Sequence, residues 1–394
     1  IARKVETQMK AMVAPGSIFE ELGLNYIGPI DGHDIDELMT VIGKLKDFEG
    51  PQFLHVITKK GAGLDPAEAD RIGFHAIGKI KPLDATNKKN GPKYQDVFGQ
   101  WIVDMAKEDE ELMAITPAMR EGSGLVNFSK EFPERFYDVA IAEQHAVTLA
   151  AGMACEGKKP VVAIYSTFLQ RAYDQLIHDV ALQNLNVLFA IDRAGLVGED
   201  GPTHSGNYDL TYLRCIPNMI IAVPADENET RKLLTTTFIH NGPAAVRYPR
   251  GGGINATIEH ELNPVAIGKG RVISAQESDM LILNFGALIG TADEVAQELN
   301  ATLLDMRFVK PLDRKLIAEH SNNKKIIITI EDGAISGGAG SAVIEWAQEN
   351  KMKQQIIICG IPDEFVEHAS REEMLEMTGL DKRGILAKVK NCLA

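Results

Sequence analysis

The sequence is poor in three features that would each indicate a particular class of protein. Its 394 residues include four cysteines, Cys155, Cys215, Cys359 and Cys392, which are far apart and lack the spacing of metal ligands. This pattern excludes a disulfide framework and indicates a reducing compartment, which predicts a cytoplasmic protein. No apolar run reaches the roughly 18 residues that span a bilayer, and the first residues do not resemble a signal peptide, so no membrane partner is expected.

Positive charge is the third scarce feature. The 41 lysines and arginines are outnumbered by 55 aspartates and glutamates, which gives a formal net charge of −14. Nucleic acid is therefore not an expected partner, and an anionic substrate would need locally clustered arginines. The hydrophobic content of 45% and the charged content of 24% are those of an ordinary globular protein, and the length predicts two or three domains.

Short apolar runs alternate with helical patterns along the chain. Continuous runs such as 161–165 and 187–191 are typical of parallel strands that helices cover on both faces. The sequence therefore predicts an α/β fold of consecutive doubly wound parallel-sheet domains, divided by polar, strand-poor segments into residues 1–80, 90–250 and 265–394. The predicted strands are 52–57, 112–116, 160–165, 187–191, 219–223, 244–246, 280–285, 302–305, 325–330 and 355–359.

An acidic residue interrupts the packed face of one predicted helix. Residues 142–156 follow a β-like run that ends at Ile141, and Glu143 shares a helical stripe with Val147, Ala150, Ala151 and Ala154. A carboxylate among apolar residues needs a hydrogen-bonding partner or a raised pKa, and such groups often transfer protons. The alternative is an N-terminal acid that only stabilises the helix dipole.

Polar residues also cluster just after three predicted strands, where doubly wound sheets bind ligands. Phe168 and Arg171 follow the first of these strands and could serve a flat ring and an anion, or they could be a core phenylalanine beside a surface arginine. The segment 192–206 contains four glycines, two aspartates, an arginine and a histidine, which favours a functional loop over an irregular surface connection. Arg247 and Arg250 follow the third strand, with a solvated basic turn as the alternative.

Nine segments in order along the chain resemble one family closely. The sequence resembles the 1-deoxy-D-xylulose-5-phosphate synthases, which are thiamine-diphosphate enzymes of the transketolase superfamily. Any single match would be weak, whereas the ordered set across all three predicted pieces is specific. The matching segments are Tyr26–Asp34, Thr58–Gly61, Pro66–Glu68, Phe74–His75, Ala140–His145, Tyr165–Asp174, Ile191–Gly195, Arg247–Gly251 and Asp305–Leu312.

The resemblance implies an activity and a domain order. The family condenses pyruvate with D-glyceraldehyde 3-phosphate to 1-deoxy-D-xylulose 5-phosphate and carbon dioxide, using thiamine diphosphate and Mg²⁺. This is the first step of non-mevalonate isoprenoid biosynthesis and also supplies thiamine biosynthesis. The implied enzyme is a homodimer of the bacterial cytoplasm, or of the plastid stroma in a plant. Residues 90–250 would be its pyrimidine-binding domain and 265–394 its C-terminal domain, which contributes packing and dimer contacts.

The resemblance also implies roles for individual residues. Glu143 matches the carboxylate that hydrogen-bonds the aminopyrimidine ring of the cofactor and promotes its reactive tautomer, and Phe168 matches the aromatic residue that stacks on that ring. Arg193 and Arg250 match a clamp for the aldehyde's phosphate, because guanidinium forks suit phosphate oxygens. The other implied catalytic residues are His33 and His75, the other cofactor contacts are Arg171, Lys60 and Leu64, and the other substrate contacts are Tyr165, Asp200 and His204.

Two departures from the family pattern change these expectations. Leu64 stands where the family has an aromatic cofactor contact, so this contact would be apolar. The family holds Mg²⁺ through a Gly-Asp-Gly segment followed by an asparagine, all oxygen ligands suited to a hard cation, and no Gly-Asp-Gly occurs in the 394 residues. We therefore expect the chain to begin inside a longer protein, with the metal ligands outside this sequence and residues 1–80 as the C-terminal remnant of the diphosphate-binding domain.

Other readings remain open from the sequence alone. Transketolase and the 2-oxo-acid dehydrogenase beta subunit share the middle and last domains, and a non-catalytic module could keep the fold after losing the metal-binding domain. The segment Gly337–Gly340 could be mistaken for a phosphate loop. It lacks a Walker lysine and the acidic partner of a dinucleotide site, so close packing of a helix on a strand is the prediction there.

Overall fold

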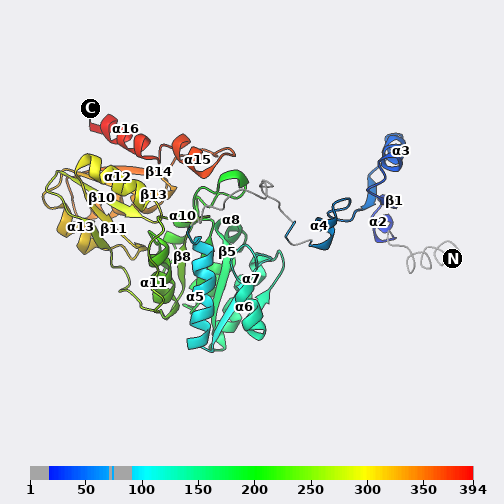
Figure 1. The fold of residues 1–394 in the computed structure, drawn as a ribbon, viewed down its shortest axis with the longest axis horizontal. Helices are drawn as coiled ribbons and strands as arrows, with labels where there is room; N and C mark the ends of the chain where they lie inside the picture. The colour runs from blue at the N-terminus through cyan, green and yellow to red at the C-terminus, as the bar shows by residue number, and fades with distance from the viewer. Residues whose placement is uncertain (1–16, 71–72, 75–90, 394) are drawn as a thin grey trace. The chain divides into compact units, whose positions relative to one another are not determined.

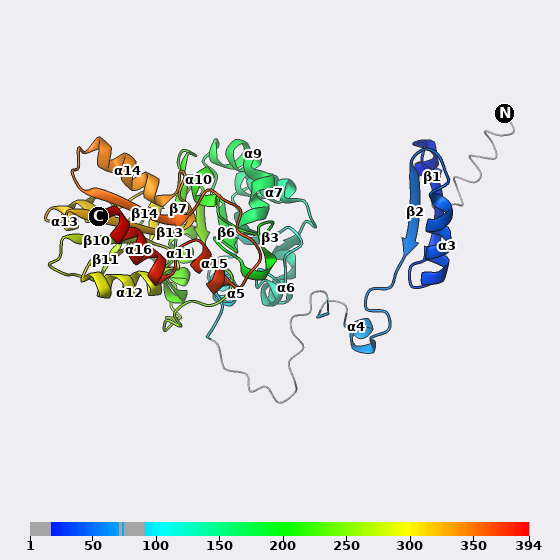
Figure 2. The same cartoon turned by 90° about the horizontal axis from the view of Figure 1, so that it is seen from above.

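The computed structural model describes residues 17–70, 73–74 and 91–393. The chain forms two compact units, residues 1–88 and 89–394. Figure 1 and Figure 2 show the elements of both units.

The N-terminal unit contains a parallel pair of strands, β1 and β2, with short helices. Ile35 and Met39 on α3 are 71% and 69% exposed, because a two-stranded sheet cannot enclose the apolar side of its helix. A contiguous apolar surface of this kind is typical of an interaction site. The elements are α2 (Ser17–Glu21), β1 (Asn25–Asp31), α3 (Ile35–Leu45), β2 (Gln52–Ile57) and α4 (Asp65–Ala69).

The second unit is built on two sheets, of which the first has seven strands. Its order is β12-β7-β8-β6-β5-β3-β4, and all neighbours are parallel except β12 and β7. Central strands are buried along their whole length, as their continuous apolar runs predict. The strands are β3 (Leu112–Thr116), β4 (Phe136–Asp138), β5 (Lys159–Tyr165), β6 (Leu188–Asp192), β7 (Ile220–Ala222), β8 (Ala244–Arg247) and β12 (Phe308–Lys310).

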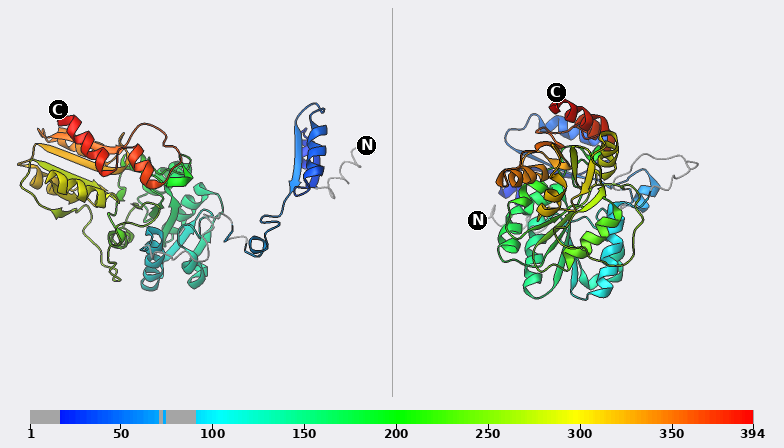
Figure 3. Two further views of the ribbon diagram at one scale, coloured as in Figure 1. Left: turned by 45° about the horizontal axis from the view of Figure 1, so that its top comes forward. Right: turned by 90° about the vertical axis from the view of Figure 1, so that its left-hand side faces the viewer.

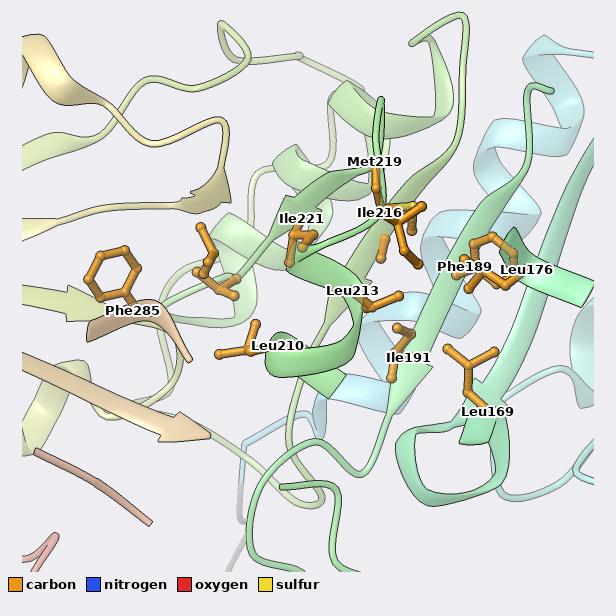
Figure 4. Packing of buried hydrophobic residues seen from close by; sticks show 14 of the residues in the cluster. Leu169, Leu176, Phe189, Ile191, Leu210, Leu213, Ile216, Met219, Ile221 and Phe285 are labelled. Carbon is orange, nitrogen blue, oxygen red and sulfur yellow. The ribbon is translucent and has the colours of Figure 1, made fainter. Parts of the chain in front are cut away.

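Helices cover both faces of this sheet. One apolar cluster joins α5 and α11 to one face, and a second joins α7, α9 and α10 to the other. Figure 4 shows the second cluster, in which Phe189 and Ile191 of β6 lie near Leu169, Leu176 and Leu213. The helices are α5 (Tyr94–Glu108), α6 (Val126–Glu131), α7 (Glu143–Cys155), α8 (Ser166–Leu169), α9 (Tyr173–Gln175), α10 (Asp209–Arg214) and α11 (Glu227–Phe238).

The second sheet has the order β14-β13-β10-β11-β9, with β9 antiparallel at its edge. Figure 3 shows α15 and α16 leading to the C-terminus on the outside of this sheet. The strands are β9 (Arg271–Ser274), β10 (Met280–Phe285), β11 (Thr302–Asp305), β13 (Ile326–Ala334) and β14 (Gln355–Ile361). The helices are α12 (Ile289–Leu299), α13 (Arg314–Ser321), α14 (Ala339–Glu349), α15 (Arg371–Met377) and α16 (Lys382–Leu393).

The predicted α/β class is confirmed, and each predicted strand corresponds to an observed one within a few residues. The expected β-like run to Ile141 is wrong, because β4 ends at Asp138 and Ala140 has a positive φ of 56° that no extended strand accommodates. The strands β1, β9 and β12 were not predicted. Of these, β9 and β12 are short strands at the edges of their sheets.

A buried ion-pair network joins the two sheets. The Nε atom of Arg247 donates to Asp209 at 2.9 Å, and its Nη1 atom pairs with Asp332, which belongs to β13 of the C-terminal sheet. All three side chains are almost fully buried. The two carboxylates raise the pKa of Arg247 against the opposing effect of burial, so this cation stays charged. One guanidinium thus serves two buried carboxylates, which depend on it as their shared cation.

We expect Arg247→Met to lower the free energy of unfolding by about 3–5 kcal/mol, because it leaves two buried carboxylates without their cation. Urea unfolding followed by circular dichroism measures this loss. The control is Arg314→Met, whose exposed pair with Glu349 spans 3.8 Å and is expected to contribute less than about 1 kcal/mol. Equal losses for the two variants would contradict the assignment of a buried network.

The segment Gly337–Gly340 packs a helix on a strand, as predicted. A Cβ atom on Gly340 would lie 2.6 Å from the side chain of Ile358 on β14. The amides at the start of α14 are occupied internally, because Ala339 N and Gly340 N donate to the Glu331 carboxylate at 2.7 and 2.8 Å. Burial raises the pKa of Glu331 to about 7, against these two hydrogen bonds. An external phosphate therefore has no place at this helix end.

Candidate active site

The candidate site lies where the parallel strands of the first sheet end. Tyr165 at the end of β5 is paired in register with Asp192 at the end of β6, and Ile191 is paired with Arg247 of β8. Parallel strands present their carboxyl ends at one edge, so segments far apart in sequence meet there. Three polar clusters of the sequence therefore fall on the same edge of the sheet.

A strained turn positions Glu143 at the first residue of α7. The Asp138 carboxylate accepts the backbone N–H groups of Ala118 and Ala140 at 3.0 Å each, and Ala140 adopts a φ of 56°. A non-glycine residue in this region costs of order 1–2 kcal/mol, which the two hydrogen bonds and the packed helix offset. Asp138 and Ala140 thus set where the glutamate begins its helix, and of the two only Ala140 belongs to the matched segment Ala140–His145.

The Glu143 side chain is buried and ion-paired. Only 3% of the residue is exposed, and its Oε1 atom accepts from Nη1 of Arg171. Val147, Ala150 and Ala151 are buried on the same helix, which confirms the predicted packed face. A carboxylate can accept about four hydrogen bonds, so the pair with Arg171 leaves capacity for a ring nitrogen of a ligand. The partner that the sequence required for this acid is therefore Arg171.

Aromatic rings line the floor beside this pair. The Phe168 and Tyr165 rings stack with centroids 5.4 Å apart, and the His204 ring meets Phe168 edge-on at 5.6 Å. The Arg171 guanidinium lies 5.5 Å from the centroid of Phe168, within cation–π range. Arg171 therefore links the flat ring of Phe168 to the buried carboxylate of Glu143, an arrangement that suits an aromatic ring bearing nitrogens.

Arg193 is held more firmly than the sequence suggested. Its Nη1 atom donates to Gln95 Oε1 and to Gly122 O at 2.8 Å each and pairs with Asp192, while the guanidinium lies 4.3 Å from the Tyr165 ring centroid. Burial raises the pKa of Asp192 to about 6, against the charge of Arg193. Arg193 therefore serves the architecture of this edge as well as any ligand. Gln95, Gly122 and Asp192 carried no signal of this in the sequence.

Arg250 closes the loop 193–206 from the other side. It donates to Val197 O at 2.8 Å and pairs with Asp200 at 2.9 Å. The base of the loop is fixed by reciprocal backbone bonds between Gly195 and Gly206. Burial raises the pKa of Tyr165 to about 12, with Arg193 and Arg250 opposing this shift and Asp192 and Asp200 adding to it. The charges of both arginines thus reach the hydroxyl of Tyr165.

The remaining predicted residues belong to the N-terminal unit or lie outside the described residues. His33 accepts the Lys59 N–H at 2.7 Å through Nε2, at the end of the β1–α3 turn. Leu64 precedes α4 and is 47% exposed, and Lys60 lies in the same connection. His75 lies outside the described residues. The structure therefore brings together the predicted residues of the second unit and leaves the placement of His33, Lys60 and Leu64 beside them as a prediction.

The described residues fit one half of the expected cofactor. Glu143, Phe168 and Arg171 form the setting that an aminopyrimidine needs. Across the ranges 17–70, 73–74 and 91–393, no three His, Cys, Asp or Glu side chains gather in a way that could hold a metal ion.

In the same ranges no helix has the length and apolar character to cross a membrane.

Three models of known protein families and domains match parts of the chain. The model described as the transketolase pyrimidine-binding domain matches residues 90–253, and that of the transketolase C-terminal domain matches residues 268–385. A third, described as 1-deoxy-D-xylulose-5-phosphate synthase, matches residues 1–58. Among solved structures, a split-gene transketolase described as an inactive beta4 tetramer has a TM-score of 0.69 and 28% identity, covering 77% of this chain and 98% of its own.

The curated relatives are more similar in sequence. The 1-deoxy-D-xylulose-5-phosphate synthase of Pseudomonas syringae pv. syringae is 60% identical and that of Pseudomonas putida KT2440 is 59% identical, each over 397 aligned residues that cover 100% of this chain. Fold and site thus define a transketolase-type α/β protein. Within that class the chain is similar over its whole length to the 1-deoxy-D-xylulose-5-phosphate synthases. It spans 63% of the length of these relatives.

Proposed function

We propose that the chain supplies the pyrimidine-binding part of a thiamine-diphosphate site that condenses pyruvate with D-glyceraldehyde 3-phosphate to 1-deoxy-D-xylulose 5-phosphate and carbon dioxide. The observation that carries this proposal is the buried Glu143 carboxylate at the start of α7, paired with Arg171, whose guanidinium lies over the Phe168 ring. The names of the relatives support the same reaction. When bound, the cofactor supplies the nucleophilic carbon that neither substrate offers.

Glu143 would move a proton at the pyrimidine ring. Its position at a helix start, among apolar side chains, fixes the carboxylate and excludes water, which strengthens a hydrogen bond from a ring nitrogen. Arg171 would orient the carboxylate by holding Oε1, and Phe168 would support the ring face. In this proposal, His33 and His75 are the further proton-transferring groups, while Lys60 and Leu64 contact the cofactor.

The arginines around the loop 193–206 would bind the phosphorylated aldehyde. Arg250 has the more adaptable guanidinium, because its side chain is 37% exposed whereas that of Arg193 is 12% exposed and engaged by protein acceptors. An incoming phosphate would compete with Asp200 for Arg250. Tyr165, Asp200 and His204 would then surround the aldehyde's hydroxyl groups, because they border the same loop and the same aromatic floor.

A second segment would complete the site. We use the name complementary segment for the part of the Pseudomonas syringae relative that lies outside the matched 63% of its length. It would supply oxygen ligands for the Mg²⁺ that binds the diphosphate, and it would cover the apolar side of α3 around Ile35 and Met39.

The assembly would form a homodimer, since Ile141 and Leu182 are apolar and more than three-quarters exposed (78% and 76%). Its setting would be the cytoplasm, and its product would enter isoprenoid and thiamine biosynthesis.

We expect Arg250→Ala, in the chain assembled with the complementary segment, to raise the KM for D-glyceraldehyde 3-phosphate about tenfold or more with little change in the KM for pyruvate. The reason is that only the aldehyde carries a phosphate for the guanidinium to bind. Steady-state kinetics with each substrate varied in turn provide the test. The matched control is Arg383→Ala, which removes an exposed arginine from α16. Equal changes in both KM values would refute the phosphate clamp.

A further inference from the structure

A cavity of about 290 Å³ lies between the loop 193–206 and the C-terminal domain. Its walls are residues 197–199 of the loop, residues 250–252 after β8, and residues 370–372 at the start of α15. This volume is close to the lower end of the range for small-molecule sites, roughly 300–1,000 Å³. Arg250, the exposed arginine of the proposed clamp, thus shares a cavity with residues from the last domain.

The C-terminal segment is packed tightly against the loop. A Cβ atom on Gly201 would lie 2.3 Å from the His368 ring, and one on Gly198 would lie 3.5 Å from the backbone nitrogen of Arg371. Gly201 has a φ of 68° and Gly198 a φ of 76°, so both positions favour glycine for conformation as well as for space. The start of α15 is therefore part of the wall around Asp200 and Arg250.

Arg371 is the cation that this segment adds to the cavity. Within the described residues its side chain has no ion-pair partner, and its buried Nε atom has no hydrogen-bond acceptor. The Nη atoms of Arg371 are accessible and also have no partner among the described residues, so an anion in the cavity can pair with this guanidinium through them. The carboxylates that border the cavity do not fill this need, because Glu199 is 79% exposed and pairs with Arg250, and Glu372 is exposed.

The opposite wall leaves room for a ligand. The backbone turn at Gly251 is held from behind, where Tyr94 N donates to Gly251 O at 2.9 Å, and a Cβ atom on Gly251 would meet nothing within 4 Å. Burial raises the pKa of Tyr94 well above the usual phenol range, whereas the charge of Arg371 acts in the opposite direction. The positive charge of Arg371 therefore acts on Tyr94, the residue that anchors the Gly251 turn.

We propose that Arg371 is a second anion-recognition residue of this site, so that the C-terminal domain contacts the phosphate group of the acceptor substrate together with Arg250. This inference rests on the proposed function and deepens it, because it assigns a binding role to a domain for which the sequence indicated only packing. Two guanidinium groups from different domains would hold one phosphate group, which neither arginine could enclose alone.

Titration calorimetry of the 394-residue chain with glycerol 3-phosphate and with inorganic phosphate tests the proposal without cofactor, because the cavity lies wholly within residues 89–394. We expect Arg371→Gln to weaken glycerol 3-phosphate binding about tenfold, as the loss of one charge-assisted contact implies, and Arg371→Lys to restore part of it. Arg383→Gln, which removes an exposed charge from the same domain, should leave binding within twofold of the original. Circular dichroism melting of each variant monitors the fold.

The outcomes separate this inference from the proposed function. Weakening by both Arg371→Gln and Arg250→Ala, with an unchanged melting temperature, supports both. Weakening by Arg250→Ala alone, with Arg371→Gln equal to Arg383→Gln, overturns the role of Arg371 and leaves the clamp intact. Absence of phosphate binding, or binding that neither variant changes, overturns the clamp and this inference together. Tighter binding of inorganic phosphate than of glycerol 3-phosphate would show a free-anion site and would overturn the assignment to the substrate.

Discussion

Glu143→Gln is expected to reduce kcat for carbon dioxide release about 10²–10⁴-fold in the chain assembled with the complementary segment. Glutamine has the shape of glutamate and its amide oxygen can still accept from Arg171, so the fold and the local hydrogen bond are retained. It cannot exchange a proton with the pyrimidine ring, and a positioned acid–base group contributes an effect of this size. The loss should therefore appear in the chemical step.

The matched control is Glu156→Gln, which changes an exposed glutamate at the C-cap of the same helix and should leave kcat unaltered. Circular dichroism of both variants establishes that they fold. A folded Glu143→Gln enzyme with kcat within a few-fold of the original would sink the catalytic assignment and return Glu143 to the role of a helix-dipole acid.

The chain by itself is expected to show no saturable binding of thiamine diphosphate, and the complementary segment is expected to restore it. The diphosphate carries most of the cofactor's charge, and the 394 residues contain no Gly-Asp-Gly segment to place Mg²⁺ against it. Calorimetry with thiamine diphosphate and Mg²⁺, on the chain, on the segment and on their mixture, gives the comparison. Tight Mg²⁺-dependent binding by the chain alone would contradict the division of the site.

A pair of variants on α3 tests how the two parts associate. Met39→Asp places a charge in the exposed apolar stripe. It should reduce the thiamine diphosphate binding that the complementary segment restores, because burying an unpaired carboxylate is unfavourable. Thr40→Asp adds the same charge one position further along the same helix, outside that stripe, and should have a much smaller effect. If the two variants reduce the restored cofactor binding equally, then the apolar stripe is not the contact surface.

Much of the second unit could be predicted because its signals are local. Continuous apolar runs such as 187–191 identified buried parallel strands, since a strand covered on both faces cannot alternate. The burial of Glu143 followed from helical periodicity, because its stripe partners had to face the core. The packing of Gly340 against β14 followed from the missing features of a phosphate loop.

The rest depended on contacts between distant residues. Arg193 was expected to bind the aldehyde's phosphate together with Arg250, and the structure adds that Gln95, Gly122 and Asp192 engage its guanidinium. Arg247 resembled its neighbour Arg250 as a basic residue after a strand, yet it is buried between Asp209 and Asp332. Nothing in a linear pattern distinguishes these arginines, because the acceptors that decide their roles come from other strands.

The sequence by itself determined the α/β class, the central strands of the two larger sheets, the buried acid at the start of α7 and the family that the chain resembles. Only the tertiary structure decided which arginines are free to meet a ligand, that the strained turn at Ala140 positions Glu143, and that Arg371 faces the same cavity as Arg250. The physical reason is that periodicity and motifs record the environment of a residue along its own segment. Charge pairing and cavity walls arise only when the parallel strand ends and the C-terminal domain are brought together.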